Sequence, residues 1–140
     1  MIAERAAEIA ELSTRFRALR ADEIAAEIAR ITHLLNNQTC EPAPTNMLDV
    51  ADKPRADVAA WLAGLNLPNT RVHACWISLR EGVEMQLSDF VRHYDELWLP
   101  GADDVCVSDP NGQFVLFFDH EERITAWCQT CVDAASHASN

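Results

Sequence analysis

Hydrophobic residues recur at helical spacing through residues 2–38, which predicts an amphipathic helical segment at the start of the chain. One apolar stripe ends at Leu19, and a second stripe in a different register begins at Ile24. The five-residue interval between them fits neither stripe, and Asp22 within it is a suitable helix N-cap. The pattern therefore leaves open one bent helix or two helices joined by a tight turn.

Three prolines mark the stretch that follows, so residues 39–54 are expected to form a loop. Arg55–Leu65 predicts a short helix, because its larger apolar residues share one helical face. The clearest amphipathic helix in the chain is predicted over residues 87–98, where apolar residues recur on one face and charged residues fill the other. Pro100 follows it and is expected to stop it.

Strand patterns appear in the second half of the chain. Arg71–Leu79 carries apolar residues on both faces, which is typical of a strand covered on both sides, and the Glu-Gly pair at 81–82 is expected to turn the chain. Val105–Val107 and Phe114–Phe118 predict a hairpin around Asp109–Gly112, because Asn-Gly supplies the positive φ that a tight turn needs.

The end of the chain is open to two interpretations. Residues 119–122 can turn the chain into a further strand at Ile124–Trp127, or they can begin a helix with Asp119 as its cap. We favour the turn and strand, followed by a short helical or frayed segment. The small polar residues at 134–140 predict a disordered tail.

These elements predict a single α+β domain over residues 1–140, in which helical residues outnumber strand residues. An antiparallel sheet of three to four strands packs against the N-terminal helices and a central amphipathic helix. The domain divides into a helical segment, a loop, an α+β core and a tail, which span residues 1–38, 39–54, 55–133 and 134–140. The strands of the sheet are expected at 71–79, 103–108, 113–119 and, as the optional fourth, 123–128.

Composition narrows the class of protein. With 49% hydrophobic and 24% charged residues the chain is typical of a globular domain, and its longest apolar runs, residues 58–63 and 114–118, are far shorter than the roughly 20 residues that span a bilayer. The net charge is −11 and is unevenly distributed. Residues 1–80 hold 9 basic and 10 acidic residues, whereas residues 81–140 hold two basic and 12 acidic ones. This charge argues against direct binding to nucleic acid or to anionic membranes, and it favours a basic protein partner.

The cysteines offer the most suggestive chemistry. Their odd number, five, and the acidic residues near the N-terminus, where a secretory leader would be basic and then apolar, lead us to expect reduced thiols and a cytoplasmic protein. Cys128 and Cys131 form a CxxC pair that is able to bind zinc or to cycle as a dithiol. Further zinc ligands would have to come from Cys106, His120 or His137 without paired spacing, so we interpret the pair as packing thiols.

No catalytic signature is found elsewhere in the sequence. His120 with Glu121 and Glu122 resembles part of a metal or acid–base cluster, but Ile124 stands where the His-Glu-x-x-His motif has its second histidine. There is no serine nucleophile elbow, and four glycines in the whole chain leave little for a phosphate-binding loop. We therefore expect no catalytic residues, no metal and no cofactor.

Three segments within residues 87–127 carry a resemblance to a known class of protein. They are Tyr94–Val105, with its Tyr-Asp-x-Leu-Trp-x-Pro helix end and Asp-Asp-Val strand entry, Phe114–Glu122 with its acidic His-Glu-Glu turn, and Ile124–Trp127. Together they resemble small bacterial immunity-type proteins encoded beside polymorphic toxins. The resemblance implies a stoichiometric inhibitor that binds a cognate effector toxin and has no catalytic residues of its own.

The charge asymmetry and the resemblance place the candidate partner-binding surface in residues 81–140. Its candidate residues are Asp95, Glu96, Trp98, Asp103, Asp104, Asp109, Glu121 and Glu122. Trp98 is open to two interpretations, because it fits the apolar stripe of its helix and also stands at a helix end where it could anchor an interface. Two other functions remain open: a small metal- or thiol-dependent enzyme that uses Cys128 and Cys131, and a regulatory adaptor subunit. If copies of the chain assemble into a homo-oligomer, as in such an adaptor, residues 1–38 are the segment through which they would do so.

Overall fold

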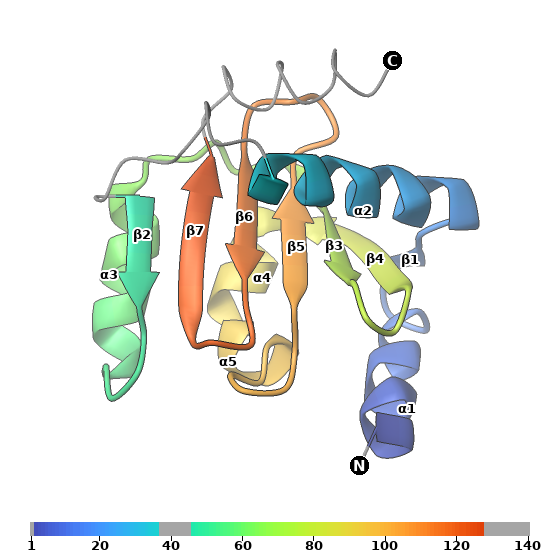
Figure 1. Cartoon of the computed structure of the whole chain (residues 1–140), viewed down its shortest axis with the longest axis horizontal. Helices are drawn as coiled ribbons and strands as arrows, with labels where there is room; N and C mark the ends of the chain where they lie inside the picture. Colours follow the sequence, from blue (N-terminus) through green and yellow to red (C-terminus); the bar gives the residue numbers. More distant parts are fainter. Residues whose placement is uncertain (1, 37–45, 128–140) are drawn as a thin grey trace.

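A computed structural model describes residues 2–36 and 46–127 and shows an antiparallel sheet with helices on both faces (Figure 1). Within these residues the elements, in chain order, are α1 (Ile2–Leu12), β1 (Arg17–Ala18), α2 (Ala21–Asn36), β2 (Met47–Asp49), α3 (Arg55–Gly64), β3 (Arg71–Trp76), β4 (Glu81–Gln86), α4 (Leu87–Arg92), α5 (Tyr94–Leu97), β5 (Val105–Ser108), β6 (Val115–Phe118) and β7 (Arg123–Trp127). The strands lie in the order β1-β4-β3-β5-β6-β7-β2, and every neighbouring pair is antiparallel.

The α+β class is confirmed, but the expected three to four strands are an undercount, since the described residues form seven. Residues 47–49, expected in a loop, form the edge strand β2 and pair with β7. The pair at 81–82 does not turn the chain, because it begins β4. The turn lies earlier, at residues 77–80, where Arg80 adopts a φ of 53°. Residues 103–104 precede β5 rather than belonging to it.

The N-terminal segment is two helices, and a short strand, β1, lies between them. The first helix ends at Leu12, so the last part of its expected apolar stripe, up to Leu19, is not helical, and the change of hydrophobic register near Leu19 marks only the start of the second helix at Ala21. Asp22 is not the N-cap; α2 begins at Ala21, and the Glu23 carboxylate accepts a hydrogen bond of 2.9 Å from the backbone N–H of Arg20. Glu23 also binds the Arg17 guanidinium at 2.9 Å, and this contact lowers the pKa of the Glu23 carboxyl to about 2.

The hairpin of β5 and β6 and the final strand β7 are confirmed. The backbone N–H of Gly112, whose φ is 83°, donates to the carbonyl of Asp109 in the turn between β5 and β6. The predicted helix over residues 87–98 is interrupted at His93, where φ is −116° and ψ is 20°, so that it forms α4 and α5. The expected tail, residues 134–140, and the short helical or frayed segment expected before it lie outside the described residues, which end at Trp127.

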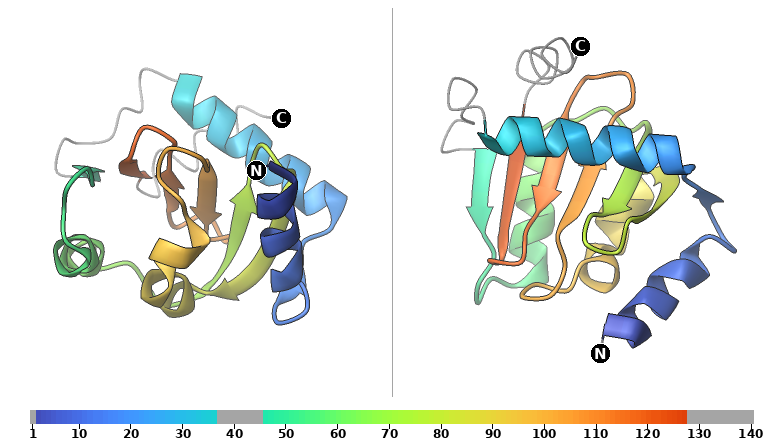
Figure 2. Two further views of the ribbon diagram at one scale, coloured as in Figure 1. Left: turned by 90° about the horizontal axis from the view of Figure 1, so that it is seen from below. Right: turned by 45° about the vertical axis from the view of Figure 1, so that its right-hand side comes forward.

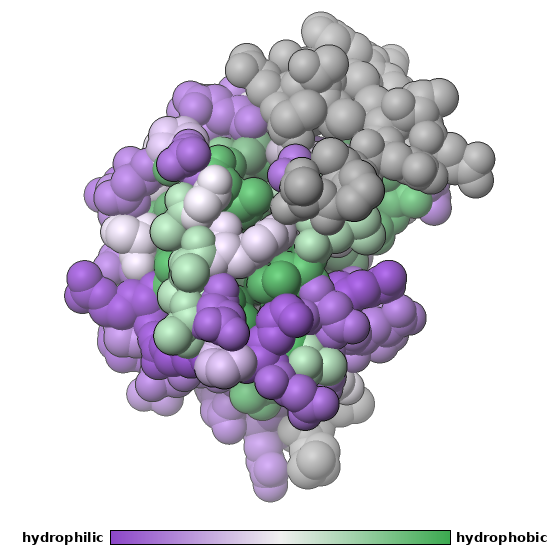
Figure 3. All heavy atoms as spheres, turned by 90° about the vertical axis from the view of Figure 1, so that its left-hand side faces the viewer, coloured by the Kyte–Doolittle hydropathy of each residue, from purple (hydrophilic) through white to green (hydrophobic). Residues whose placement is uncertain are grey.

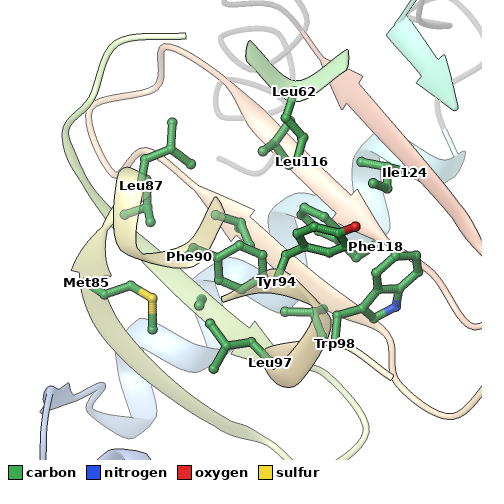
Figure 4. Packing of buried hydrophobic residues seen from close by; sticks show 14 of the residues in the cluster. Leu62, Met85, Leu87, Phe90, Tyr94, Leu97, Trp98, Leu116, Phe118 and Ile124 are labelled. Carbon is green, nitrogen blue, oxygen red and sulfur yellow. The ribbon is translucent and has the colours of Figure 1, made fainter. Parts of the chain in front are cut away.

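The main hydrophobic core lies on the face of the sheet that α3, α4 and α5 cover (Figure 2). At its centre Phe118 packs against Phe90 and Trp98, with ring centroids 5.1 and 5.3 Å apart (Figure 4). Burial of each such side chain contributes about 1.5–3 kcal/mol to stability. Ile9 and Leu12 attach α1 to the same core. Seen from the side of β2 and α3, hydrophobic residues reach the surface between hydrophilic ones (Figure 3).

The opposite face of the sheet is covered by α2 (Figures 1 and 2). Ile31 and Leu34 of this helix pack on Phe117 of β6, and Ile24 packs on Cys75 of β3. The strand β3 is therefore covered on both sides, as the pattern of residues 71–79 predicts. No helix in the described parts of the chain is long and apolar enough to cross a membrane.

Candidate functional site

One end of the sheet gathers exposed carboxylates from segments far apart in the sequence. The β6–β7 turn, α5, the segment before β5 and the first half of α1 all lie at this end (Figure 1). Two hydrogen bonds demonstrate the proximity: Arg5 of α1 donates to the carbonyl of Leu97 in α5 at 3.0 Å, and His120 Nδ1 lies 2.9 Å from Asp104 Oδ1. We call the exposed or half-buried carboxylates here the acidic end; they are Glu4, Glu8, Asp95, Glu96, Asp104, Glu121 and Glu122.

Five of the predicted partner-binding residues belong to this acidic end: Asp95, Glu96, Asp104, Glu121 and Glu122. The side chain of Glu96 is 79% exposed and that of Glu121 is 61% exposed, although Arg123 pairs with Glu121 at 2.8 Å. Asp95 pairs with Arg55 at 2.9 Å. The acidic end therefore presents carboxylates that a partner can reach, some already bound to cations of this chain.

The other three predicted partner-binding residues are buried. Trp98 is fully buried, and its indole N–H donates to the carbonyl of Asp103 at 3.3 Å, so it is a core residue rather than an exposed anchor. Asp109 lies at the opposite end of the sheet, where its carboxylate accepts the N–H of Asn111 in the β5–β6 turn. Asp103 is 6% exposed. Their contacts give these residues structural roles.

Asp103 binds the guanidinium of Arg5. Its Oδ2 accepts hydrogen bonds from Arg5 Nη2 at 2.6 Å and from Nε at 3.1 Å, and it also accepts the backbone N–H of Leu99 at 3.0 Å. The outer nitrogen, Nη1, binds Glu8 at 2.7 Å. This partly buried pair ties α1 to the segment before β5, across 98 positions of sequence.

A pocket of about 480 Å³ opens beside this ion pair. Trp76, Leu79, Leu99 and Ala102 supply apolar surface. Leu99 is one of three large hydrophobic residues that are strongly exposed among the described residues, at 39%. The remaining lining residues are polar or charged: Glu4, Arg5, Glu8, Ser78, Asp103 and Asp104. The pocket therefore joins an apolar surface to a carboxylate rim.

Asp104 on this rim also sets the charge of a histidine. The hydrogen bond that the imidazole N–H donates to the Asp104 carboxylate, followed by the negative charge of that carboxylate, raises the pKa of the exposed His120 above its ordinary value of 6.5. The imidazole is therefore protonated over a wider pH range than in a free peptide, and it neutralises part of the rim. The backbone N–H of His120 donates to the same oxygen at 2.8 Å, which fixes the β6–β7 turn against this segment.

A second polar cluster is buried between α2 and the sheet. Glu27, 3% exposed, accepts a short hydrogen bond from the hydroxyl of Ser108, and its Oε1 lies 3.3 Å from His73 Nδ1 and 3.5 Å from Arg30 Nη1. In a serine nucleophile the histidine lies between the serine and the carboxylate, whereas here the carboxylate is in the middle. This order does not activate Ser108.

Two buried thiols adjoin this cluster. Cys75 and Cys106 face each other across β3 and β5, and both are reduced. Burial, reinforced by the charge of Glu27, raises the pKa of Cys75 to about 12 and raises that of Cys106 as well. Thiols in this state are poor nucleophiles at neutral pH. No group of three or more potential metal ligands is found within residues 2–36 and 46–127, and Cys128 and Cys131 lie outside these ranges.

Sequence reasoning found the acidic residues of the second half but missed the contribution of α1. Glu4 and Glu8 line the pocket, and Arg5 connects Glu8 to Asp103. Comparison with protein-family models, with curated proteins and with solved structures gives no match to this chain.

Proposed function

We propose that this protein binds and neutralises a cognate bacterial effector toxin as a stoichiometric inhibitor, and that the acidic end is the surface that meets the toxin. The observation that carries the proposal is the convergence of exposed carboxylates from α1, α5, the segment before β5 and the β6–β7 turn on one end of the molecule. Many toxic nucleases and deaminases present a basic substrate cleft, which such a surface would cover without chemistry.

The resemblance of residues 87–127 to immunity-type proteins supports the same function. Those residues supply α5, the segment before β5 and the β6–β7 turn, which are most of the acidic end. The buried serine and thiols described above favour a binding protein over an enzyme that would use them. Electrostatic attraction of this kind mainly speeds association, so binding should weaken as salt rises.

The test is co-expression with the toxin domain encoded by the neighbouring gene. We expect rescue of growth and a one-to-one complex on a sizing column. A neighbouring gene that encodes no toxin, or a toxin that is neither neutralised nor bound, would contradict the proposal.

Two charge-reversal variants test the surface. Glu96→Lys lies in the acidic end, and Asp22→Lys lies on α2 away from it. The two side chains are 79% and 75% exposed, and each change adds the same charge. We expect Glu96→Lys to slow association about tenfold at low salt and Asp22→Lys to have less than a twofold effect. Equal effects of both variants would show that net charge, rather than this surface, governs binding.

A further inference from the structure

The pocket of about 480 Å³ at the acidic end has the chemical character of a site for a long cationic side chain. Its apolar surface, from Trp76, Leu79 and Leu99, matches the hydrocarbon stem of such a side chain. Its rim carries the carboxylates of Glu4 and Asp104, which match the charged head. A bare metal ion would not contact the apolar surface, and an apolar ligand would not bind the carboxylate rim.

One guanidinium already lies in the wall of this pocket. Arg5 is held by the nearly buried Asp103 through two of its nitrogens, and its Nη2 also donates to the carbonyl of Leu97 at 3.0 Å. The segment around Asp103 therefore combines carboxylate and carbonyl acceptors in the planar arrangement that a guanidinium requires. Arg5 uses these acceptors itself, whereas the carboxylates of Glu4 and Asp104, which also line the pocket, are not bound by Arg5.

The outer acceptors are available to a partner. Among the described residues no cation pairs with Glu4, and Asp104 pairs with His120 alone. Glu4 and Asp104 come from α1 and from the segment before β5, and the pocket lies between these two elements. A guanidinium that enters along Leu99 would reach these two carboxylates, and its stem would cover that exposed side chain.

We propose that this pocket receives an arginine side chain of the partner protein, between Glu4 and Asp104 and over Leu99. The inference rests on the proposed function and adds the chemical group that is recognised and its place. Arginine fits better than lysine, because its planar head makes paired hydrogen bonds to carboxylates and is more weakly hydrated.

The first experiment uses three blocked tripeptides, with arginine, lysine or citrulline between two glycines, titrated into the full chain and followed by NMR. We expect the arginine peptide to shift the signals of Leu79, Leu99 and Ala102, the lysine peptide to bind several-fold more weakly, and the uncharged citrulline peptide to produce no shift. Equal binding of all three peptides, or shifts confined to other surfaces, would overturn the proposal.

Matched variants then isolate the pocket. Glu4→Gln removes a rim carboxylate, and Glu11→Gln removes an exposed carboxylate of the same helix that does not line the pocket. We expect Glu4→Gln to weaken binding of the arginine peptide and of the toxin about five- to tenfold, and Glu11→Gln to change either by less than twofold. Equal effects of the two variants would overturn the proposal.

Ala102→Trp, which fills the pocket, gives a separate test against the toxin. We expect it to weaken toxin binding at least tenfold, with an unchanged pattern of amide signals elsewhere. If the toxin is bound and neutralised as well by Ala102→Trp as by the wild type, the pocket proposal fails and the proposed function stands. If no toxin is neutralised but the arginine peptide binds in the pocket, the proposed function fails and the pocket proposal stands.

Discussion

Replacement of Ser108 by alanine tests whether the buried cluster under α2 stabilises the fold. Ser108 is fully buried in β5, and its hydroxyl donates to the carboxylate of Glu27. The change removes one oxygen and leaves no large cavity. It also leaves Glu27, 3% exposed, without its shortest hydrogen bond, while Arg30 and His73 remain nearby.

The expected loss follows from the charge of the acceptor. A hydrogen bond to a charged group contributes about 1.5–3 kcal/mol, compared with about 0.5–1.5 kcal/mol for a neutral pair. An unfolding entropy of about 2.1 cal/mol/K per residue gives about 0.3 kcal/mol/K for a chain of this length. The Ser108→Ala variant should therefore unfold about 5–10 °C below the wild type.

Urea unfolding, followed by circular dichroism at pH 7, measures the difference in free energy from the shift in midpoint at constant slope. Ser78→Ala is the matched control, because Ser78 is exposed in the β3–β4 turn and should lose less than about 0.5 kcal/mol. In a Glu27→Gln background the acceptor is neutral, so Ser108→Ala should cost about 1 kcal/mol less than in the wild type. A loss equal to that of the control, or an identical loss in both backgrounds, would refute the reasoning.

Three further predictions concern other parts of the fold. Gly82→Ala should destabilise the protein by about 1–3 kcal/mol in the same urea assay, because the added Cβ would lie 2.9 Å from the carbonyl oxygen of Ala74. The pKa of His120, measured by NMR titration, should lie above 6.5 and return towards it in Asp104→Asn; its stabilising contribution is complete below pH 6.5 and is lost as pH rises through the raised pKa. Cys75, with a pKa of about 12, should resist iodoacetamide at pH 8 in the folded protein and react in urea, as peptide mapping would show.

The parts of the fold that depend on local chemistry could be predicted from the sequence. The β5–β6 hairpin follows from the Asn-Gly turn, and α3 from its apolar face. The short strand β1 has too few residues to show an alternating pattern, so the sequence predicts a helix where β1 lies. For β4 a signal was present: Val83 and Met85 alternate with polar residues, but the Glu-Gly pair at its start indicated a turn.

The acidic character of the site could also be predicted, but which carboxylates form it could not. Charge counting treats all carboxylates alike, whereas burial depends on which cations the fold brings to them. Asp103 is buried because Arg5, 98 positions earlier, packs against it, and the same contact brings Glu4 to the rim of the pocket. Such pairing depends on tertiary structure and leaves no periodic pattern in the sequence.

The strand order also determines when the sheet can be completed during biosynthesis. Both edge strands are made before the strands that hold them: β1 pairs with β4, and β2 pairs with β7. A nascent chain that ends before residue 123 therefore carries β2 without a neighbour and β6 with one side unpaired. Because β7 joins β6 to β2, its emergence from the ribosome closes both gaps, and the sheet can be completed only after that strand has been made.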